Sequence, residues 1–575
     1  MQPSIHQKQV IDWLQVDSNI SDAVVNSVAG SGKSTLLKLA ADAISSSNVD
    51  IRDCLVLVFN KKNKTALVKK LDSRWQYSIS TVHSAGYRVL KNYLRVRRLE
   101  VEESKYRHLA KTLDWFNGSE PQQAKVVSLS NFLKLFEFVR LTLSLLTHEA
   151  LSGLIEHYAL DINKQHLAEI SQRIEYLFKV GMDSAATEAR IDHTDMLWLP
   201  VVWQVNQSPG FKFAQRVMVD EAQDMSRLQL EFVLSLAHER AKMLFVGDPA
   251  QSINGFCGAD TDSFSNIQTR LQAKEFTLPV CYRCPKTHIE LINKLCPEIP
   301  IEPKENASTG SIKVISEWDL WSETKNSRIK PGDLVVARCS SSLIELHLKM
   351  IVRGIPCNLV GSSLQQDLLH LLEDIAEQTG FNYQKFAEFS QSYLKFKQSI
   401  YQENDNGAIL LLQLKDQIKA VEAIYNHFQS RSLAELASSI KQLFGSEDDE
   451  AVLLSTIHRA KGMESERVYI AEPLTLPLIW ESQKQWQSQQ EQNLLYVALS
   501  RSTRDLFLIG DAFWFDGNRP SHGNLVLTDK TIANSDGDSV EEMIFKASNG
   551  ELEHYAKLIR LEQGKRVELN LRSLL

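Results

Sequence analysis

The sequence predicts an α/β protein with two parallel-sheet lobes, each interrupted by a helical insertion. Short apolar runs that end in polar residues alternate with helical patterns, and this alternation is typical of parallel sheets. The runs form one set before about residue 250 and a second set after about residue 330. Two long stretches, about 85–210 and about 362–449, have helical periodicity and no clear strand, so we expect them to be insertions.

The expected strands are the most apolar of these runs. In the first lobe they are "AVVNSV" (23–28), "LVLVF" (55–59), "VMVD" (217–220) and "MLFVGD" (243–248). In the second lobe they are "LVVAR" (334–338), "VLLST" (452–456), "VYIAE" (468–472) and "LFLIGD" (506–511). The domain division that follows is first lobe 1–84 and 211–279, first insertion 85–210, second lobe 280–361 and 450–515, second insertion 362–449, and a C-terminal extension of unknown role at 516–575.

Composition limits the class of protein. The chain has 575 residues, of which 43% are hydrophobic and 23% charged, as in globular proteins of several domains. A formal net charge of −7 means that a nucleic-acid partner needs a local basic surface rather than a global positive field. Seven cysteines do not suggest a disulfide framework, and we find neither a signal sequence nor an apolar run of membrane-spanning length. We therefore expect a soluble intracellular protein, cytoplasmic if its source is prokaryotic, without a membrane partner.

A glycine-rich loop predicts a nucleoside triphosphate site. The stretch "AGSGKST" follows an expected strand and opens an expected helix, which is the context of a P-loop. Backbone N–H groups around Gly30 and Gly32 would hold phosphate oxygens, Lys33 would reach the β- and γ-phosphates, and Ser34 would bind Mg²⁺. A glycine-rich turn without a nucleotide is the alternative, which this context disfavours. The predicted nucleotide-binding residues of the loop are Ala29, Gly30, Ser31, Gly32, Lys33, Ser34 and Thr35.

An acid pair at the end of a second expected strand suits the same chemistry. In "VMVDEAQD" (217–224), Asp220 is placed to hold a metal ion. Glu221 beside it would orient and deprotonate the water that attacks the γ-phosphate. A surface acid pair without a role is the alternative, and the neighbouring P-loop makes us favour catalysis.

These residues carry a resemblance to a known family. "DEAQD" together with "GDPAQSINGFCGA" (247–259) resembles superfamily 1A helicases of the UvrD/Rep type. The other motifs of that family follow in its order, from residue 5 to about 511: "IHQKQ" (5–9), "VFNKKNKTAL" (58–67), "STVHSAGYRVL" (80–90), "LPVCYRCP" (278–285), "STIHRAKGMESERV" (455–468) and "EQNLLYVALSRS" (491–502). The "FNK" form of the second of these is similar to the F-box helicase-like branch.

The resemblance implies a fold and an activity. The fold would be two RecA-like P-loop lobes with a helical insertion in each. The activity would be that of an ATP-dependent DNA helicase or translocase, moving 3′ to 5′ on single-stranded DNA in repair, recombination or replication. The implied cofactors are ATP and Mg²⁺, and the implied partner is single-stranded or tailed duplex DNA bound by a monomer or weak oligomer.

The resemblance also implies roles in ATP hydrolysis. Gln9 would face the adenine edge, Tyr282 would stack on the adenine, and Glu464 would bind the ribose. Gln251 would sense the γ-phosphate, while Arg283 and Arg501 from the second lobe would clamp it, as planar guanidinium groups can. The implied catalytic residues are Lys33, Asp220, Glu221, Gln251, Arg283 and Arg501, with Ser34 and Asp220 as metal ligands.

The implied nucleic-acid contacts come from both lobes. Phe59 and Phe256 would stack on bases, beside Asn60 and Lys61. The residues expected at the strand backbone or sugars are Thr81, His83, Thr456 and His458. Basic and aromatic residues also alternate in "GYRVLKNYLRVRR" (86–98), which suits a strand channel or, alternatively, a solvated helix face.

Two departures from the family pattern affect this prediction. Asn254 stands where the family has an aromatic residue. The absence of that aromatic ring would cost about 1–3 kcal/mol of base stacking. Cys257 stands where the family has an arginine that links the two sites. We therefore expect weaker strand binding or looser coupling. The alternative function is a nucleic-acid-gated ATPase switch or DNA-end sensor that acts with a partner such as a nuclease, without processive unwinding.

Two further patterns have metal-like spacing. "CYRC" (281–284) has the spacing of half a zinc site or of a redox pair. "IDHTDM" (191–196) places two aspartates around a histidine. Because the first already supplies motif residues and the second has no partner motif, we favour structural roles for both.

Overall fold

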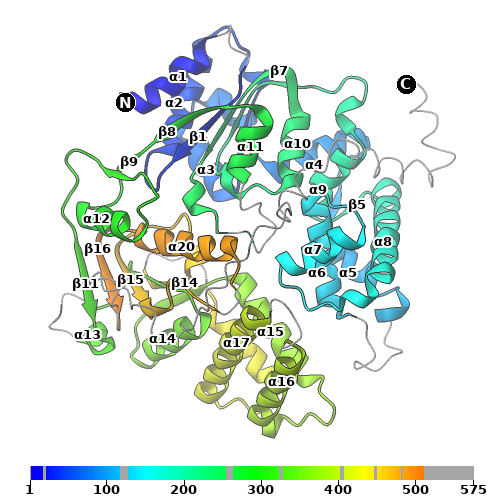
Figure 1. Ribbon diagram of the computed structural model, residues 1–575, viewed down its shortest axis with the longest axis vertical. Coiled ribbons are helices and arrows are strands. Elements are labelled where there is room, and N and C mark those ends of the chain that lie inside the picture. The colour runs from blue at the N-terminus through cyan, green and yellow to red at the C-terminus, as the bar shows by residue number, and fades with distance from the viewer. Residues whose placement is uncertain are drawn as a thin grey trace, which may run out of the picture.

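The computed structural model describes residues 2–16, 21–116, 127–253, 255, 263–322, 325, 328–401, 407–445, 450–480 and 483–510. Within these residues the chain is an α/β protein with two six-stranded sheets, and every strand pairing in both sheets is parallel (Figure 1). The predicted fold class of two parallel-sheet lobes is confirmed.

The first sheet has the strand order β3-β2-β6-β7-β1-β8. Its strands are β1 (Ala23–Ser27), β2 (Cys54–Val58), β3 (Ile79–Thr81), β6 (Ala214–Val219), β7 (Ala237–Gly247) and β8 (Lys274–Leu278). The central strands are buried on both faces, which explains their continuous apolar runs. The helices around this sheet are α1 (Ile5–Gln15), α2 (Lys33–Ser45), α3 (Lys61–Lys70), α10 (Arg227–Leu236) and α11 (Ser263–Leu271).

The second sheet has the strand order β11-β16-β15-β12-β14-β13. Its strands are β11 (Ser311–Ile315), β12 (Leu334–Ala337), β13 (Cys357–Val360), β14 (Val452–Thr456), β15 (Ser465–Ala471) and β16 (Ser502–Ile509). Its helices are α12 (Lys286–Leu295), α13 (Glu317–Trp321), α14 (Ser340–Val352), α19 (Ile457–Ala460) and α20 (Gln485–Leu499). A short parallel pair, β9 (Val280–Cys281) and β10 (Glu302–Pro303), precedes this sheet.

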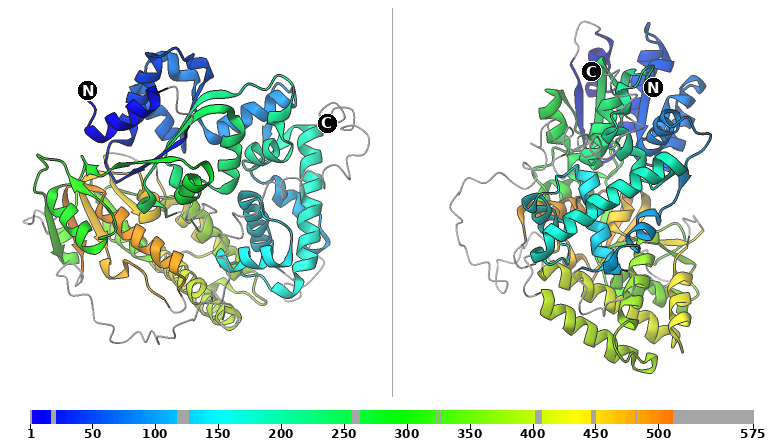
Figure 2. Two further views of the ribbon diagram at one scale, coloured as in Figure 1. Left: turned by 45° about the horizontal axis from the view of Figure 1, so that its top comes forward. Right: turned by 90° about the vertical axis from the view of Figure 1, so that its right-hand side faces the viewer.

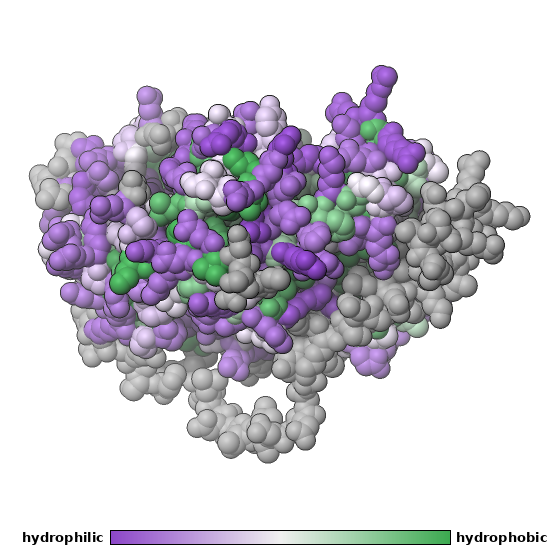
Figure 3. Space-filling view, turned by 90° about the horizontal axis from the view of Figure 1, so that it is seen from above, coloured by the Kyte–Doolittle hydropathy of each residue, from purple (hydrophilic) through white to green (hydrophobic). Residues whose placement is uncertain are grey.

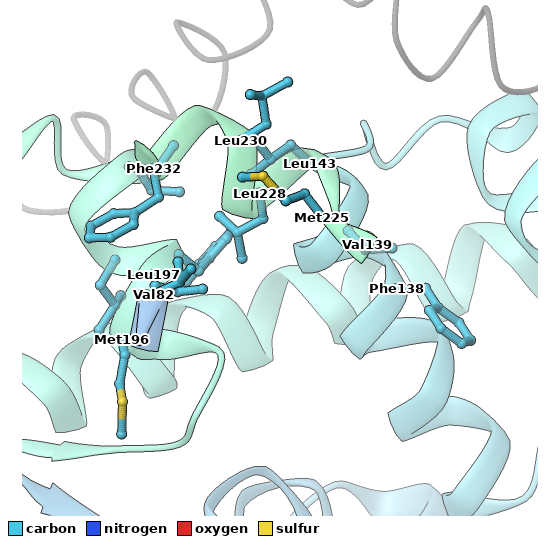
Figure 4. Close-up of a cluster of buried hydrophobic side chains, with 14 of the residues drawn as sticks. Val82, Phe138, Val139, Leu143, Met196, Leu197, Met225, Leu228, Leu230 and Phe232 are labelled. Atoms are coloured by element: carbon cyan, nitrogen blue, oxygen red, sulfur yellow. The ribbon is translucent and has the colours of Figure 1, made fainter. Parts of the chain in front are cut away.

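The first insertion packs on the first lobe through one apolar cluster. It contains α4 (Val82–Tyr93), α5 (Lys105–Ala110), α6 (Leu129–Thr142), α7 (His148–His157), α8 (Leu167–Glu188) and α9 (Asp195–Val202), with a two-stranded pair of β4 (Glu100–Val101) and β5 (Arg190–Ile191). Figure 4 shows part of the cluster, where Leu143 of the insertion lies beside Met225 and Leu228 of the first lobe. Shared burial of this kind makes the insertion a firm extension of the lobe.

A buried ionic network lies inside the first insertion. The Lys105 ammonium contacts Asp195 at 2.6 Å and donates to the Gly181 carbonyl at 2.8 Å. The Arg140 guanidinium pairs with Asp192 at 2.7 Å and with Asp195 at 3.1 Å. Both aspartates of "IDHTDM" are therefore held by cations of the protein. The described residues contain no group of three or more His, Cys, Asp or Glu side chains that could hold a metal ion.

The second insertion is a set of helices that shares a core with one face of the second sheet. Its helices are α15 (Ser362–Ala376), α16 (Phe386–Tyr401), α17 (Gly407–Phe428) and α18 (Leu433–Leu443).

On the surface seen from above Figure 1, most side chains are hydrophilic and the apolar ones are scattered (Figure 3). None of the described helices is both long enough and apolar enough to span a bilayer.

The two halves of the molecule touch at two separate places (Figures 1 and 2). At the first, which we call the seam, Val28, Ala29 and Ile253 of the first lobe share a buried cluster with α12 and α20 of the second. The second, which we call the distal contact, lies between the end of α7 and the other half. There His157 stacks on Trp486 with ring centroids 4.3 Å apart, and Lys397 of α16 pairs with Asp161 at 2.9 Å.

Candidate nucleotide site and nucleic-acid interface

The phosphate-binding loop joins β1 to α2 at the seam. Gly30 and Gly32 have φ angles of +67° and +87°, a left-handed conformation that favours glycine. A side chain at Gly30 would also place its Cβ 2.6 Å from the Arg283 Cβ, so glycine lets the second lobe approach the loop. The hydroxyl of Ser31 is buried and has no hydrogen-bond partner among the described residues. A buried, unpaired hydroxyl in this loop fits a site for phosphate oxygens.

The acid pair lies directly opposite the loop lysine. The Lys33 ammonium contacts the Glu221 carboxylate at 2.9 Å. Burial, and then the charge of Glu221, raise the pKa of Asp220, whereas Lys33 and Lys461 lower the pKa of Glu221 against the effect of its burial. Glu221 has a φ of +54°, which is strained for a residue with a side chain and is typical of functional sites.

A glutamine and an aspartate connect the acid pair to the predicted phosphate sensor. Gln223 donates to Glu221 at 2.7 Å and accepts a hydrogen bond from the Asp248 N–H at 2.9 Å. The Gln251 amide donates to the Asp248 carboxylate at 2.6 Å. Because Gln251 is held by Asp248, its orientation depends on this buried carboxylate. We assigned no role to Gln223 or Asp248 from the sequence, although both stand inside the quoted motifs.

The two predicted arginines belong to the second lobe, and Arg283 packs against the phosphate-binding loop at Gly30. Arg283 is paired with Glu464 at 2.6 Å. Arg501 is buried, and its partners are the carbonyls of Val497 and Met463 and the hydroxyl of Ser500. Burial, and then the neighbouring Arg283, lower the pKa of Arg501 to about 10. None of the ion pairs among the described residues includes Arg501, so its charge suits an anionic ligand.

The predicted adenine and ribose residues lie at the edge of the seam. Tyr282 is 46% exposed, and its N–H donates to the Gly30 carbonyl at 2.9 Å. Gln9 is exposed on α1, while the buried glutamine of that helix is Gln7, whose amide would be 3.2 Å from a Cβ at Gly32. Gln7 therefore lies beside Gly32 of the loop, and the adenine contact of Gln9 stays a prediction.

The described residues predicted to contact nucleic acid lie where strands of the two sheets end. Phe59, 37% exposed, and Asn60 follow β2, and Lys61 opens α3. The Thr81 hydroxyl caps α4 by accepting a hydrogen bond from the Ser84 N–H at 3.1 Å. Phe256, Asn254 and Cys257 lie outside the described residues.

The histidines of this face are neutral near pH 7. Burial, and then His193, lower the pKa of His83, whose ring lies 6.4 Å from the His193 ring. In the second lobe Thr456 ends β14 and His458 follows on α19, where burial and then Arg338 lower its pKa to about 3. Uncharged imidazoles can exchange hydrogen bonds with a strand but add no positive charge.

Lys461 and Tyr496 are among the side chains of the second lobe that cross the seam without having been predicted. Lys461 donates to both oxygens of Asp224, at 2.7 and 2.6 Å, and to the Gln251 carbonyl. Tyr496 contacts the phosphate-binding loop, as described below. Both residues belong to motifs quoted above, and no other feature of the sequence indicated their contacts. Their partners are too distant in sequence for a local pattern to show them.

Two P-loop lobes that meet around a phosphate-binding loop define the class of this chain as a two-lobed P-loop protein. The chain belongs to the UvrD/Rep helicase family. Residues 11–272 match the UvrD/REP helicase N-terminal domain, and residues 451–509 match the UvrD-like helicase C-terminal domain.

Similar proteins come from distant organisms. An F-box DNA helicase protein 1 of Schizosaccharomyces pombe is 25% identical over 51% of this chain and 33% of its own length. The ATP-dependent DNA helicase srs2 of the same species is 24% identical over 35% of this chain and 22% of its own length. A probable DNA helicase II homolog of Mycoplasma genitalium is 23% identical over 84% of this chain and 82% of its own length. The match thus spans a third or less of the first two relatives.

Proposed function

We propose that this chain is an ATP-dependent DNA helicase or translocase that moves on single-stranded DNA, with 3′ to 5′ polarity, in repair or recombination. The observation that supports it best is the composition of the seam. Lys33 and Glu221 come from one lobe, and Arg283 and Arg501 come from the other. A site assembled from two lobes works only when they close, so hydrolysis is tied to their movement.

The Lys33–Glu221 pair places the loop ammonium and the proposed base side by side. With a triphosphate bound, the ammonium would contact the phosphates and Glu221 would orient the attacking water. Ser34 and Asp220 would hold Mg²⁺, which neutralises charge on the phosphates.

The arginines would stabilise the negative charge that develops on the transferring phosphate late in the reaction. Phosphoryl transfer spreads negative charge over the equatorial oxygens, and an arginine finger contributes about 10³–10⁵ in rate. This factor corresponds to about 4–7 kcal/mol. Arg501 carries no carboxylate partner among the described residues, so little has to be broken before it engages the γ-phosphate.

Strand movement would follow from the positions of the proposed contacts. Phe59 and Lys61 belong to the first lobe, and Thr456 and His458 belong to the second. When the lobes close on ATP, these two groups approach each other along the strand, and they separate again after hydrolysis. One closure per ATP then advances the protein, provided that each group releases the strand in turn.

The test is steady-state ATPase activity with and without a single-stranded oligonucleotide, followed by unwinding of 3′-tailed and 5′-tailed duplexes. Lys33→Ala serves as the blank. We expect stimulation by the strand, loss of activity in the blank, and unwinding of the 3′-tailed duplex only. Stimulation without unwinding of either duplex would favour the gated ATPase switch instead, and activity indifferent to DNA would refute both.

A further inference from the structure

One tyrosine of the second lobe reaches both halves of the catalytic machinery in the first. Tyr496 lies on α20 and is 0% exposed. Its hydroxyl accepts a hydrogen bond from the Ala29 N–H at 2.7 Å and donates one to the Asp248 carboxylate at 3.2 Å. These partners are 467 and 248 residues away in sequence, so only the docked lobes bring them together.

The two partners of this hydroxyl belong to different parts of the site. Ala29 begins the phosphate-binding loop, directly before Gly30. Asp248 is 1% exposed, and its carboxylate also accepts hydrogen bonds from the Gln251 amide at 2.6 Å and the Ala250 N–H at 3.1 Å. The hydroxyl thus connects the phosphate-binding loop at Ala29 to the Asp248 carboxylate, which orients Gln251, the predicted γ-phosphate sensor.

Separation of the lobes would remove both hydrogen bonds together. The Ala29 N–H would lose its partner, and the buried Asp248 carboxylate would lose a donor, each of which costs free energy unless water replaces the hydroxyl. Phenylalanine would retain the place of the ring in the buried seam cluster but could make neither bond. The role of the hydroxyl can therefore be separated from the role of the ring.

We propose that Tyr496 is a positioning residue for ATP hydrolysis. Its hydroxyl forms both hydrogen bonds only when the second lobe has docked. These bonds hold the phosphate-binding loop at Ala29 and orient Gln251 through Asp248. This inference rests on the proposed function and extends it by naming the group through which closure reaches the loop. Because the residue acts on orientation and not on binding, it should change kcat more than KM.

The matched variants are Tyr496→Phe and Tyr469→Phe. Tyr469 is also fully buried in the second lobe, but it lies on β15, stacks on Phe507 at 4.7 Å and bonds Arg467, away from the seam. We would measure kcat and KM for ATP with and without single-stranded DNA, and the melting temperature of each variant. We expect Tyr496→Phe to lower the DNA-stimulated kcat about tenfold, or about 1.4 kcal/mol, with KM within about twofold. Tyr469→Phe should retain kcat at a similar melting temperature.

A double variant shows whether the effect passes through Asp248. Asp248→Asn keeps the shape of the side chain and removes its charge. If part of the effect of Tyr496 passes through Asp248, the combined variant should lose less activity than the sum of the two single losses, and what remains reports the bond to Ala29. Undiminished stimulation in Tyr496→Phe, fully additive losses, or an equal loss in Tyr469→Phe would overturn the inference. A wild-type chain without DNA-stimulated ATPase would instead refute the proposed function itself.

Discussion

Replacing Lys461 by alanine should open the seam. The change removes two contacts of its ammonium with Asp224 and leaves that carboxylate, 3% exposed as a side chain, buried without its cation. Breaking a buried ion pair costs about 3–5 kcal/mol. The lower end applies here because burial already raises the pKa of Asp224, which can therefore take up a proton instead. About 3 kcal/mol lowers the ratio of closed to open lobes roughly 100-fold.

The assay is DNA-stimulated ATPase activity at saturating DNA and limiting ATP. We expect kcat/KM to fall about 100-fold in Lys461→Ala, since only closed lobes hydrolyse ATP. A second variant, Lys461→Met with Asp224→Asn, removes both charges and should recover much of the loss because no unpaired charge remains. Lys397→Ala is the control, since its pair with Asp161 in the distal contact is more exposed and worth about 0–1 kcal/mol. Wild-type activity in Lys461→Ala, or no recovery in the double variant, would refute the reasoning.

Three further outcomes follow from the site and the first insertion. Glu221→Gln should still bind a fluorescent ATP analogue but lose at least about 100-fold in kcat, because it keeps the shape and loses the base; an active variant would exclude that role. Burial raises the pKa of Asp248 to about 6, and protonation would turn one of the oxygens that accept from Gln251, Tyr496 and Ala250 into a donor, so kcat/KM should rise as pH increases through about 6. Asp248→Asn should lack this rise, and a profile that it leaves unchanged would assign the titration elsewhere. Asp195→Ala leaves the Lys105 ammonium buried beside one carbonyl. It should lower the free energy of the first unfolding transition in urea by about 3–5 kcal/mol. An unchanged urea midpoint would contradict the stabilising role of the ionic network.

The sequence predicts the interior of each sheet better than its edges. Eight strands were expected, and they correspond to the inner strands of both sheets. The four strands of these two sheets that were not expected, β3, β8, β11 and β13, are their edge strands. β8, for example, buries only Phe276 and Leu278. An edge strand packs fewer side chains, so it lacks the continuous apolar run by which a central parallel strand is recognised.

The candidate site shows a similar division. The loop at Gly30 and the acid pair after β6 are local patterns, and the structure brings them together as their spacing suggested. The contacts of Tyr496 and Lys461 are not local, since Lys461 and Asp224 are separated by 237 residues. The order of the motifs predicts the lobe to which Tyr496 and Lys461 belong. It does not predict their partners, because those depend on how the two lobes dock.

The distal contact and the seam share one helix of the second lobe. His157 of α7 stacks on Trp486 near the start of α20, and Tyr496 on the same helix contacts the phosphate-binding loop. A shift of α20 along its axis would therefore change the packing against the first insertion and the hydrogen bond to the loop together.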